Sequence, residues 1–411
     1  MIAPHGGRLV RRFAGGPAAD ALREEAKRLP QVPLAPKEAA DAVLIAIGAY
    51  SPLDGFMDQE TYRTVVEEMH LPGGLPWTLP VTLPVEENLA RRLRPGSRVA
   101  LRAPRLLAVM EVQDVFRRDP AAEAQRVFGT TESHHPGAVR TLGEPPWVLG
   151  GGIWLVDRPP TPFPERALDP EQTRAHIDRA GWRTVTAFQT RNPTHRAHEY
   201  LQKCALEITD GLLFHPLVGE TKDDDIPALV RMRCYEALLK SYYPRGRVLL
   251  ATFPAAMRYG GPREAVFHAV VRKNYGATHI IIGRDHAGVG NFYDPYASQH
   301  IFRSFDPRAL EITPLFFENS FFCRRCNGMA TVKTCPHTPE VRVTLSGTRL
   351  RAMLQAGEMP PAEVVRPEVA VLLIESYSAG LPAPGGVTSP NGDRPGTGET
   401  AQPAPPRQSH S

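Results

Sequence analysis

Residues 188–199 are Phe188-Gln189-Thr190-Arg191-Asn192-Pro193-Thr194-His195-Arg196-Ala197-His198-Glu199. They follow an apolar run, residues 184–188, that is typical of a buried strand. After them, apolar side chains recur every three or four positions, which predicts a helix over 195–208. Asn192 suits the N-cap of that helix and Pro193 suits its first turn. The pattern therefore predicts a strand that passes through a polar loop into a helix N-terminus.

Polar side chains that bind anions gather at this predicted junction. Arg191 and Gln189 offer donors beside the unpaired N–H groups of a helix start, a place that attracts phosphate or sulfate. His195 and His198 are three residues apart and share one helix face, so both can bind one polyanion. Such a pair also occurs as a helix cap, as surface decoration or as a metal site, although helical zinc pairs usually have i, i+4 spacing.

A second strand end carries a similar set of polar residues. Residues 280–290 have the sequence IIIGRDHAGVG, an apolar run that ends at Gly283 and continues with Arg284, Asp285 and His286. Ligands of open α/β sheets bind at the carboxyl ends of strands, where both motifs lie. The glycines do not form a GxGxxG fingerprint, which argues against NAD binding. A surface ion pair between Arg284 and Asp285 would explain neither His286 nor the position at a strand end.

Strands and helices alternate through the middle of the chain, which predicts a parallel sheet covered by helices. The expected strands are 184–188, 211–217, 247–252 and 278–283, and the expected helices are 195–208, 226–242 and 262–275. Short apolar runs broken by turn residues predict a mostly β domain with some helices before them. After them we expect a strand at 341–345 and helices at 348–355 and 367–379. The predicted units are a β-rich domain at 1–165, a catalytic domain at 166–320, a zinc-binding domain at 321–380 and a disordered tail at 381–411, where 12 of 31 residues are proline or glycine.

Three of the five cysteines form a pattern with a histidine, C-x2-C-x8-C-x-H. Four such ligands suit a closed, tetrahedral structural Zn²⁺ site. The alternatives are free thiols, or one disulfide in an oxidising compartment. The expected ligands are Cys323, Cys326, Cys335 and His337, with His337 the least certain because one residue separates it from Cys335. Cys204 and Cys234 lie on apolar helical faces and are expected in the core.

The overall composition predicts a cytoplasmic enzyme. The chain has 411 residues and a net charge of +4 with dispersed basic residues, which argues against a nucleic-acid groove. No apolar run approaches the length needed to cross a bilayer, and the N-terminus lacks the apolar region of a signal peptide.

Several separated motifs, in order, closely resemble the ATP sulfurylase (sulfate adenylyltransferase) family. The most specific are residues 189–198, 284–288 and 256–265, the last with the sequence AMRYGGPREA. Residues 4–7, 51–57, 345–348 and 366–369 fit as well, so the resemblance extends over nearly the whole chain. Residues 222–227, KDDDIP, depart from the family, which more often has glycine before the last aspartate. No GxxxxGK[ST] P-loop occurs, so we expect no fused APS kinase domain, and the cysteines resemble the zinc-containing bacterial and archaeal form.

The resemblance implies an α/β fold with three parts and a direct reaction. The parts are an N-terminal mostly β, PUA-like domain, a central Rossmann-like nucleotidyltransferase domain with a parallel sheet, and a small C-terminal zinc-containing α/β domain. ATP and sulfate would give adenosine 5′-phosphosulfate and pyrophosphate reversibly, by in-line transfer without a covalent nucleophile. Mg²⁺ would arrive with ATP. The family also suggests a homodimer.

Site roles follow from the same resemblance. Gln189, Arg191 and the backbone N–H of Ala287 would bind sulfate. His195 and His198 would contact the ATP phosphates, Asn192 the α-phosphate, and Arg284 would add positive charge. Asp285 and His286 would position the nucleotide, and the backbone of Met329 and Ala330 would line the adenine pocket. The implied catalytic residues are Arg191, Asn192, His195, His198 and Arg284; the implied substrate-binding residues are Gln189, Thr190, Arg191, Asn192, Gly283, Arg284, Asp285, His286, Ala287, Met329 and Ala330.

Two other functions stay open at this point. One is a different HxxH nucleotidyltransferase that uses another acceptor, such as a phosphorylated cofactor. The other is a zinc-containing nucleic-acid or protein interaction module, which predicts steeply salt-dependent binding and leaves both strand-end motifs without a purpose.

Overall fold

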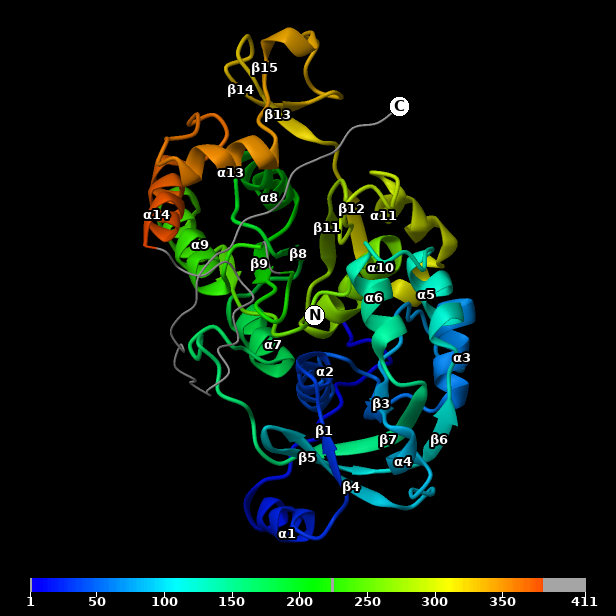
Figure 1. The fold of residues 1–411 in the computed structure, drawn as a ribbon. Coiled ribbons are helices and arrows are strands. Elements are labelled where there is room, and N and C mark those ends of the chain that lie inside the picture. Colours follow the sequence, from blue (N-terminus) through cyan, green and yellow to red (C-terminus); the bar gives the residue numbers. More distant parts are fainter. Residues whose placement is uncertain (1, 223–224, 380–411) are drawn as a thin grey trace, which may run out of the picture.

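Two large sheets and one small sheet form the framework of the structure (Figure 1), a computed structural model that describes residues 2–222 and 225–379. The predicted tail, 381–411, lies outside the described residues. Within the described ranges, no helix is both long and apolar enough to cross a membrane.

The N-terminal domain is built on a mixed sheet in which the long strand β7 pairs with four others. Its strands are β1 Gln31–Pro33, β2 Gly55–Phe56, β3 Leu83–Val85, β4 Arg98–Ala103, β5 Arg105–Glu111, β6 Asp114–Arg117 and β7 Trp147–Leu155. Its helices are α1 Gly16–Ala26, α2 Pro36–Ala46, α3 Gln59–Glu68, α4 Glu87–Ala90, α5 Pro120–Phe128 and α6 Pro136–Gly143. The β-rich domain expected here is confirmed.

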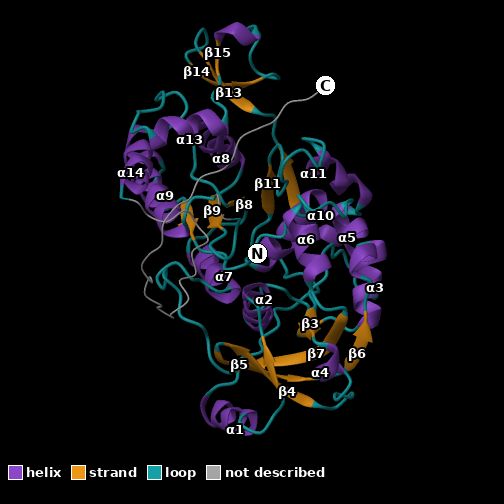
Figure 2. Cartoon of the chain, viewed as in Figure 1, coloured by secondary structure: helices purple, strands orange, loops and turns teal. Residues whose placement is uncertain are grey.

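The central domain contains the predicted parallel sheet, with strand order β10-β9-β8-β11-β12. The strands are β8 Val185–Thr190, β9 Gly211–Pro216, β10 Val248–Leu250, β11 His279–Ile282 and β12 Thr313–Phe316. The helices are α7 Pro170–Arg179, α8 Arg196–Ile208, α9 Ala228–Tyr242, α10 Gly261–Asn274, α11 Ala297–His300 and α12 Pro307–Leu310, with a 3-10 turn at Ile301–Ser304. Helices cover both faces of the sheet (Figure 2), as expected for a doubly wound fold.

Apolar residues on alternate sides of each strand enter two different cores. Ile280 and Ile282 pack into the core shared with the N-terminal domain, whereas Ile281 packs into the core on the opposite face. Leu213 and its neighbour Phe214 divide in the same way. Burial on both faces explains why these strands appear in the sequence as continuous apolar runs.

The C-terminal segment divides between a projecting module and the central domain. The strands β13 Ser320–Cys323, β14 Gly328–Thr331 and β15 Arg342–Val343 form the small sheet at the top of Figure 1, with a 3-10 turn at Pro339–Val341. The helix α14 Pro367–Ser378 instead packs beside α9, and α13 Gly347–Gln355 packs on α14. Leu354, Val369 and Leu373 belong to the same core as Phe188 of β8, so these helices help to fix the end of that strand.

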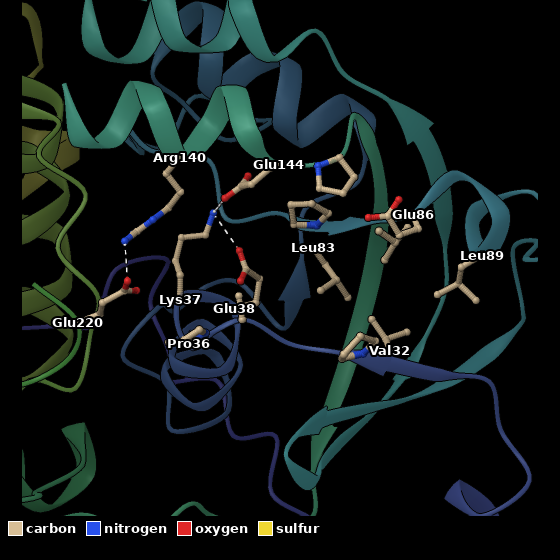
Figure 3. A pocket seen from close by; sticks show the side chains of 15 residues that line it. Val32, Pro36, Lys37, Glu38, Leu83, Glu86, Leu89, Arg140, Glu144 and Glu220 are labelled. Carbon is tan, nitrogen blue, oxygen red and sulfur yellow. Dashed lines mark hydrogen bonds and ion pairs between the residues drawn. The ribbon is translucent and has the colours of Figure 1, made fainter. Parts of the chain in front are cut away.

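A cavity of about 340 Å³ lies at the junction of the N-terminal and central domains (Figure 3), and most of its charged groups are paired. The Lys37 Nζ lies 3.0 Å from Glu38 Oε1 and 2.5 Å from Glu144 Oε1. Arg140 forms an ion pair of 3.0 Å with Glu220 across the junction. Five of its six charged side chains therefore pair with one another, Glu86 being the exception, and the Arg140–Glu220 pair stabilises the domain junction.

A second junction contact is deeply buried. Arg258, which precedes α10, donates from Nη2 to both carboxylate oxygens of Asp41 on α2, at 2.6 and 2.7 Å. The Asp41 side chain is 1% exposed and that of Arg258 is 10% exposed. The pair therefore fixes the start of α10 against the N-terminal domain.

Replacing Asp41 should be costly because it leaves the Arg258 guanidinium buried without its carboxylate. We expect Asp41→Ala to lower the free energy of unfolding by about 3–5 kcal/mol. Glu171→Ala, which breaks the exposed Arg11–Glu171 pair, is the control and should cost at most about 1 kcal/mol. Chemical denaturation measures both, and equal effects of the two variants would contradict this account of the junction.

Candidate functional site

The two polar motifs meet at the point in the central sheet where the strand order reverses direction. β8 lies in the middle of the sheet, with β9 on one side and β11 on the other, and all three strands are parallel. Residues 191–195 leave β8 and residues 283–290 leave β11, so the two loops share one sheet edge. This is the switch point at which open α/β sheets bind ligands. The expectation that both motifs lie together at strand ends agrees with this geometry.

Arg191 connects the two loops. Its Nη2 donates to the backbone oxygen of Gly288 at 3.3 Å, and its Nε lies 3.4 Å from Asp225 Oδ2. The guanidinium carbon lies 5.1 Å from the centre of the Tyr259 ring. With its side chain 16% exposed, Arg191 is held in one place by three different segments.

A cavity of about 220 Å³ opens beside Arg191. Lys222 contributes a second basic side chain to its wall, and Asp285 and Asp294 contribute carboxylates. The full lining is Arg191, Lys222, Asp285, Gly288, Val289, Gly290, Tyr293, Asp294 and Ser298. Its size and its basic groups suit a small tetrahedral anion.

His195 and His198 line a different cavity, of about 330 Å³, which shares no lining residue with the one beside Arg191. Their rings stack, with centroids 3.9 Å apart. The Nδ1 of His198 and the Oγ1 of Thr194 are buried without a hydrogen-bond partner among the described residues. The opposite wall comes from α13 and α14, which supply Leu350, Leu354, Val369, Leu373 and Tyr377. Buried polar atoms without a partner are uncommon in folded proteins, and here two of them belong to residues that line this cavity.

Both histidines are neutral near pH 7 in the free protein. Burial lowers the pKa of His195 to about 4. Burial, with a contribution from His195, lowers the pKa of His198 well below its usual range. The pair therefore offers hydrogen-bond donors without positive charge until an anion arrives.

The helix cap predicted from the sequence is wrong in detail. The N-cap of α8 is His195, and Asn192 lies in the loop that precedes the helix. Thr190 Oγ1 accepts from the Asn192 N–H, and Tyr235 donates from its hydroxyl to the Asn192 oxygen. These bonds hold the peptide of Asn192 in a turn, and they leave its exposed side chain at the mouth of the histidine cavity.

The loop after β11 has an unusual backbone. Asp285 and Ala287 both have positive φ, 55° and 58°, a region in which non-glycine residues are uncommon. The Ala287 N–H has no hydrogen-bond partner within the described part of the chain. Strained residues with an unpaired N–H group are a feature of ligand-binding loops.

The remaining predicted residues occupy varied positions. Gln189 pairs with His215 in the β8–β9 ladder, and Gly283 starts the second loop. Arg284 is exposed and forms an ion pair of 3.0 Å with Asp285, the interaction considered as an alternative from the sequence. The His286 ring turns inward to His268, 3.1 Å away. Met329 and Ala330 lie on β14, and neither lines the two cavities described above.

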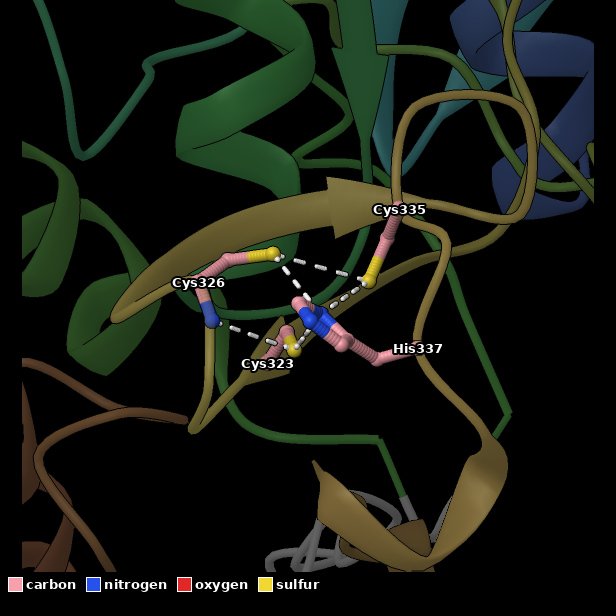
Figure 4. Close-up of side chains that lie close together, drawn as sticks. All are labelled: Cys323, Cys326, Cys335 and His337. Atoms are coloured by element: carbon pink, nitrogen blue, oxygen red, sulfur yellow. Dashed lines mark hydrogen bonds between the residues drawn. The ribbon is translucent and has the colours of Figure 1, made fainter.

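The four predicted metal ligands converge (Figure 4). The Nδ1 of His337 lies 3.4, 3.2 and 3.5 Å from the sulfurs of Cys323, Cys326 and Cys335. The sulfurs of Cys326 and Cys335 are 3.6 Å apart, and all three thiols are free. A tetrahedral Zn²⁺ site, with Zn–S bonds of about 2.3 Å and a Zn–N bond of about 2.0–2.1 Å, places its ligand atoms about 3.5–3.8 Å apart. The cluster therefore fits such an ion, and His337 completes it despite its closeness to Cys335 in the sequence.

This cluster is next to the start of α8. Ser320 of β13 donates from Oγ to the backbone oxygen of Ala197 at 3.3 Å, and the Arg196 guanidinium lies over the Phe322 ring. The N–H of Arg196 itself donates to Val364 before α14. Two C-terminal segments thus hold the first turn of the helix that presents His195 and His198.

Some residues around the site were not identified from the sequence. Tyr259, Asp225 and Tyr293 gain their significance only through contacts between distant segments. Glu264 and His268 had a weak signal: at i, i+4 spacing, Glu264 directly precedes the largely apolar run 265–271 and His268 interrupts it.

Comparisons with known proteins agree with the resemblance found in the sequence. A family model described as ATP-sulfurylase matches residues 164–376, and a PUA-like domain model matches residues 2–158. A sulfate adenylyltransferase of Symbiobacterium thermophilum is 61% identical over 381 residues, which is 92% of this chain and 97% of the relative. A sulfate adenylyltransferase of Synechococcus sp. is 54% identical and covers 91% of this chain and 96% of the relative. A solved structure described as a hexameric APS kinase from Thiobacillus denitrificans has a TM-score of 0.72 and 25% identity, covering 92% of this chain and 68% of that one.

The neutral state of His195 predicts a pH dependence of stability. The unfolded chain binds a proton on His195 below about pH 6.5, whereas the folded protein resists protonation down to about pH 4. The free energy of unfolding should therefore fall as the pH falls between these values. In His195→Gln this fall should be less steep, while the exposed His300→Gln should follow the unmodified protein. Denaturation curves measured across this range test the prediction, and identical slopes for His195→Gln and the unmodified protein would refute it.

Proposed function

Because the chain belongs to the ATP-sulfurylase family and is a sulfate adenylyltransferase, we propose that its reaction takes place where β8 and β11 end. The substrates are ATP and sulfate, and the products are adenosine 5′-phosphosulfate and pyrophosphate. The observation that carries the placement is the bond from Arg191 Nη2 to Gly288 O, which joins the two strand-end loops.

Sulfate binds beside Arg191 in this proposal. At neutral pH sulfate has no proton to remove, so the protein contributes alignment and charge neutralisation instead of base catalysis. The Arg191 fork matches a tetrahedral oxyanion, and three fixed contacts pre-organise it. Gln189 and the unpaired N–H of Ala287 supply further donors.

The ATP phosphates bind on the histidine side. His195 and His198 donate hydrogen bonds to the phosphates and to the departing pyrophosphate, and the position of both residues in the wall of this cavity supports this role. Asn192 orients the α-phosphate from the mouth of the same cavity. Approaching phosphates raise the pKa of both imidazoles, so negative charge that develops on the leaving group also favours their protonated form.

The remaining groups complete the nucleotide site. Arg284 adds positive charge, and Thr190 and Gly283 set the backbone at the two strand ends. Asp285 and His286 position the nucleotide, and the backbone of Met329 and Ala330 lines the adenine pocket. Transfer is direct and in line, and it needs no covalent intermediate. Mg²⁺ accompanies ATP and does not require a cage of protein ligands.

We assign Zn²⁺ to the cluster of Cys323, Cys326, Cys335 and His337. Three thiolates and one imidazole are its preferred donors, and four protein ligands leave no position for a substrate. The ion therefore stabilises the β13–β14 hairpin, which packs against α8. A cytoplasmic homodimer, the assembly suggested by the family resemblance, stays a prediction.

The site assignment predicts the behaviour of three variants. The unmodified protein should release pyrophosphate from Mg·ATP only when sulfate is present, in an assay coupled to pyrophosphatase because the reaction is unfavourable in this direction. His195→Ala and His198→Ala should each lower kcat by about 10²–10³ with a smaller change in the KM for ATP. Arg191→Lys should also lose activity, because the point charge of an ammonium group cannot replace the planar guanidinium, whose donors form a fork.

The exposed His300→Ala is the control for these variants and should keep normal kinetics. Pyrophosphate release that does not depend on sulfate would contradict the activity. Near-normal kcat in a variant without both His195 and His198 would show that the pair only shapes the helix start.

The metal assignment predicts one Zn²⁺ per chain in protein purified without chelator. Cys323→Ser should lose the ion, lower the melting temperature and reduce activity indirectly, because structural zinc contributes to folding and the hairpin supports α8. Cys204→Ser, outside the cluster, should keep both metal and activity. Elemental analysis measures the content: absence of zinc from the unmodified protein would reject the site, and a full complement in His337→Ala would reassign the fourth ligand.

A further inference from the structure

A series of three side chains, two of them buried and the third, His286, partly exposed, links α10 to the loop that follows β11. Glu264 and His268 lie one turn apart on α10 and are each 1% exposed. The Nε2 of His268 lies 3.4 Å from Glu264 Oε1, and its Nδ1 lies 3.1 Å from the Nε2 of His286. This series of contacts therefore ends at His286, in the middle of the loop 283–290, which also contains the proposed sulfate donor Ala287.

The chemistry of these contacts determines where the protons lie. An ionised Glu264 only accepts hydrogen bonds, so the His268 Nε2 carries a proton and the neutral ring leaves Nδ1 as an acceptor. The 3.1 Å contact then requires a proton on the Nε2 of His286. His286 is thereby fixed in one tautomer and one orientation, and its ring is directed toward α10.

The charged groups around these side chains favour this neutral state of the two histidines. Burial lowers the pKa of both His268 and His286, and the nearby Arg272 and Arg191 lower both further. Glu264 opposes this effect on His268. Arg272, fully buried over the Phe253 ring, has no hydrogen-bond partner in the described ranges, so its charge is not neutralised by a carboxylate contact. His215, also buried, faces Arg272 and His268 from β9.

The loop that contains His286 depends on contacts from other segments to keep its conformation. His286 lies between Asp285 and Ala287, both with positive φ. The backbone oxygen of His286 accepts from Ser298 Oγ at 2.8 Å, and that of Ala287 accepts from Gly261 N at 3.1 Å. Strained backbone of this kind persists only where surrounding contacts fix it.

Glu264 supports the opposite wall of the site as well. Its carboxylate accepts from the backbone N–H groups of Arg258 at 3.0 Å and Gly260 at 2.9 Å. Between them lies Tyr259, whose ring packs against Arg191. One buried carboxylate thus fixes both the aromatic support of Arg191 and, through His268, the loop that contains Ala287.

We propose that Glu264 and His268 are positioning residues for sulfate binding. They hold the Ala287 N–H and the Gly288 oxygen in place relative to the Arg191 guanidinium. Neither residue touches a substrate. This role rests on the proposed binding of sulfate by Arg191 and Ala287, and it concerns sulfate more than ATP because the histidine cavity shares no lining residue with the cavity beside Arg191.

The tautomer of His286 is tested first in the unmodified protein. Long-range ¹H–¹⁵N correlation spectra of protein labelled at the histidine rings should show His286 protonated at Nε2 and not at Nδ1, with assignment by His286→Gln. A proton on Nδ1 would overturn the proposal, because the chain of donors and acceptors would then be reversed.

Kinetics of two variants at His268 provide the second test. His268→Leu should raise the KM for sulfate about tenfold, the typical effect of a lost buried hydrogen bond, while the KM for ATP changes less than about twofold. His268→Gln keeps a donor and an acceptor and should restore most of the sulfate affinity. His5→Leu, which removes a fully buried imidazole that contacts the backbone oxygen of Pro76, is the matched control and should change neither KM.

Arg191→Ala separates failure of this proposal from failure of the site assignment. If that variant leaves the KM for sulfate unchanged, the sulfate site is wrong. If it raises the KM for sulfate while folded His268→Leu does not, the positioning role alone is refuted. Equal increases in both KM values for His268→Leu, or no rescue by His268→Gln, would show a general structural role and would also refute it.

Discussion

The contact of Arg191 with Gly288 is the constraint on which the site depends. β8 and β11 are neighbours, but the loops that leave them diverge to opposite sides of the sheet, so the backbone alone does not hold the loops together. The guanidinium provides this connection and still presents other donors to the cavity beside it. The same side chain that binds an anion in our proposal therefore also sets the width of the site.

Buried charges transmit this constraint to the rest of the molecule. Arg258 uses its side chain to bind Asp41 of the N-terminal domain and its backbone N–H to bind Glu264. A movement between the domains would therefore displace the segment that carries Tyr259 and, with it, the support of Arg191. On the opposite side, the β13–β14 hairpin and Val364, which precedes α14, hold the first turn of α8. The two halves of the site are thus fixed by different parts of the chain, which suits an enzyme that aligns two anions instead of forming a covalent intermediate.

The sequence predicted those features that depend on local pattern. Apolar runs and their polar ends located the strands, the placement of both motifs at one sheet edge and the convergence of four metal ligands. The cap of α8 was assigned incorrectly because Thr190 and Tyr235 hold the Asn192 peptide through contacts that local spacing does not reveal. β12 and α7 were not predicted, and neither was the packing of α13 and α14 on the central sheet. The inward orientation of His286 depends on His268, eighteen residues earlier on another element, so no motif in the sequence specifies it.

The central claim is that sulfate lies between the two strand-end loops, and a crystal structure with bound adenosine 5′-phosphosulfate tests it most directly. We predict that the sulfate group will lie within hydrogen-bond distance of the Arg191 guanidinium and the Ala287 N–H, with the α-phosphate near His195, His198 and Asn192. A product whose sulfate group is bound away from Arg191 and Ala287 would contradict the account, even if the protein proves fully active.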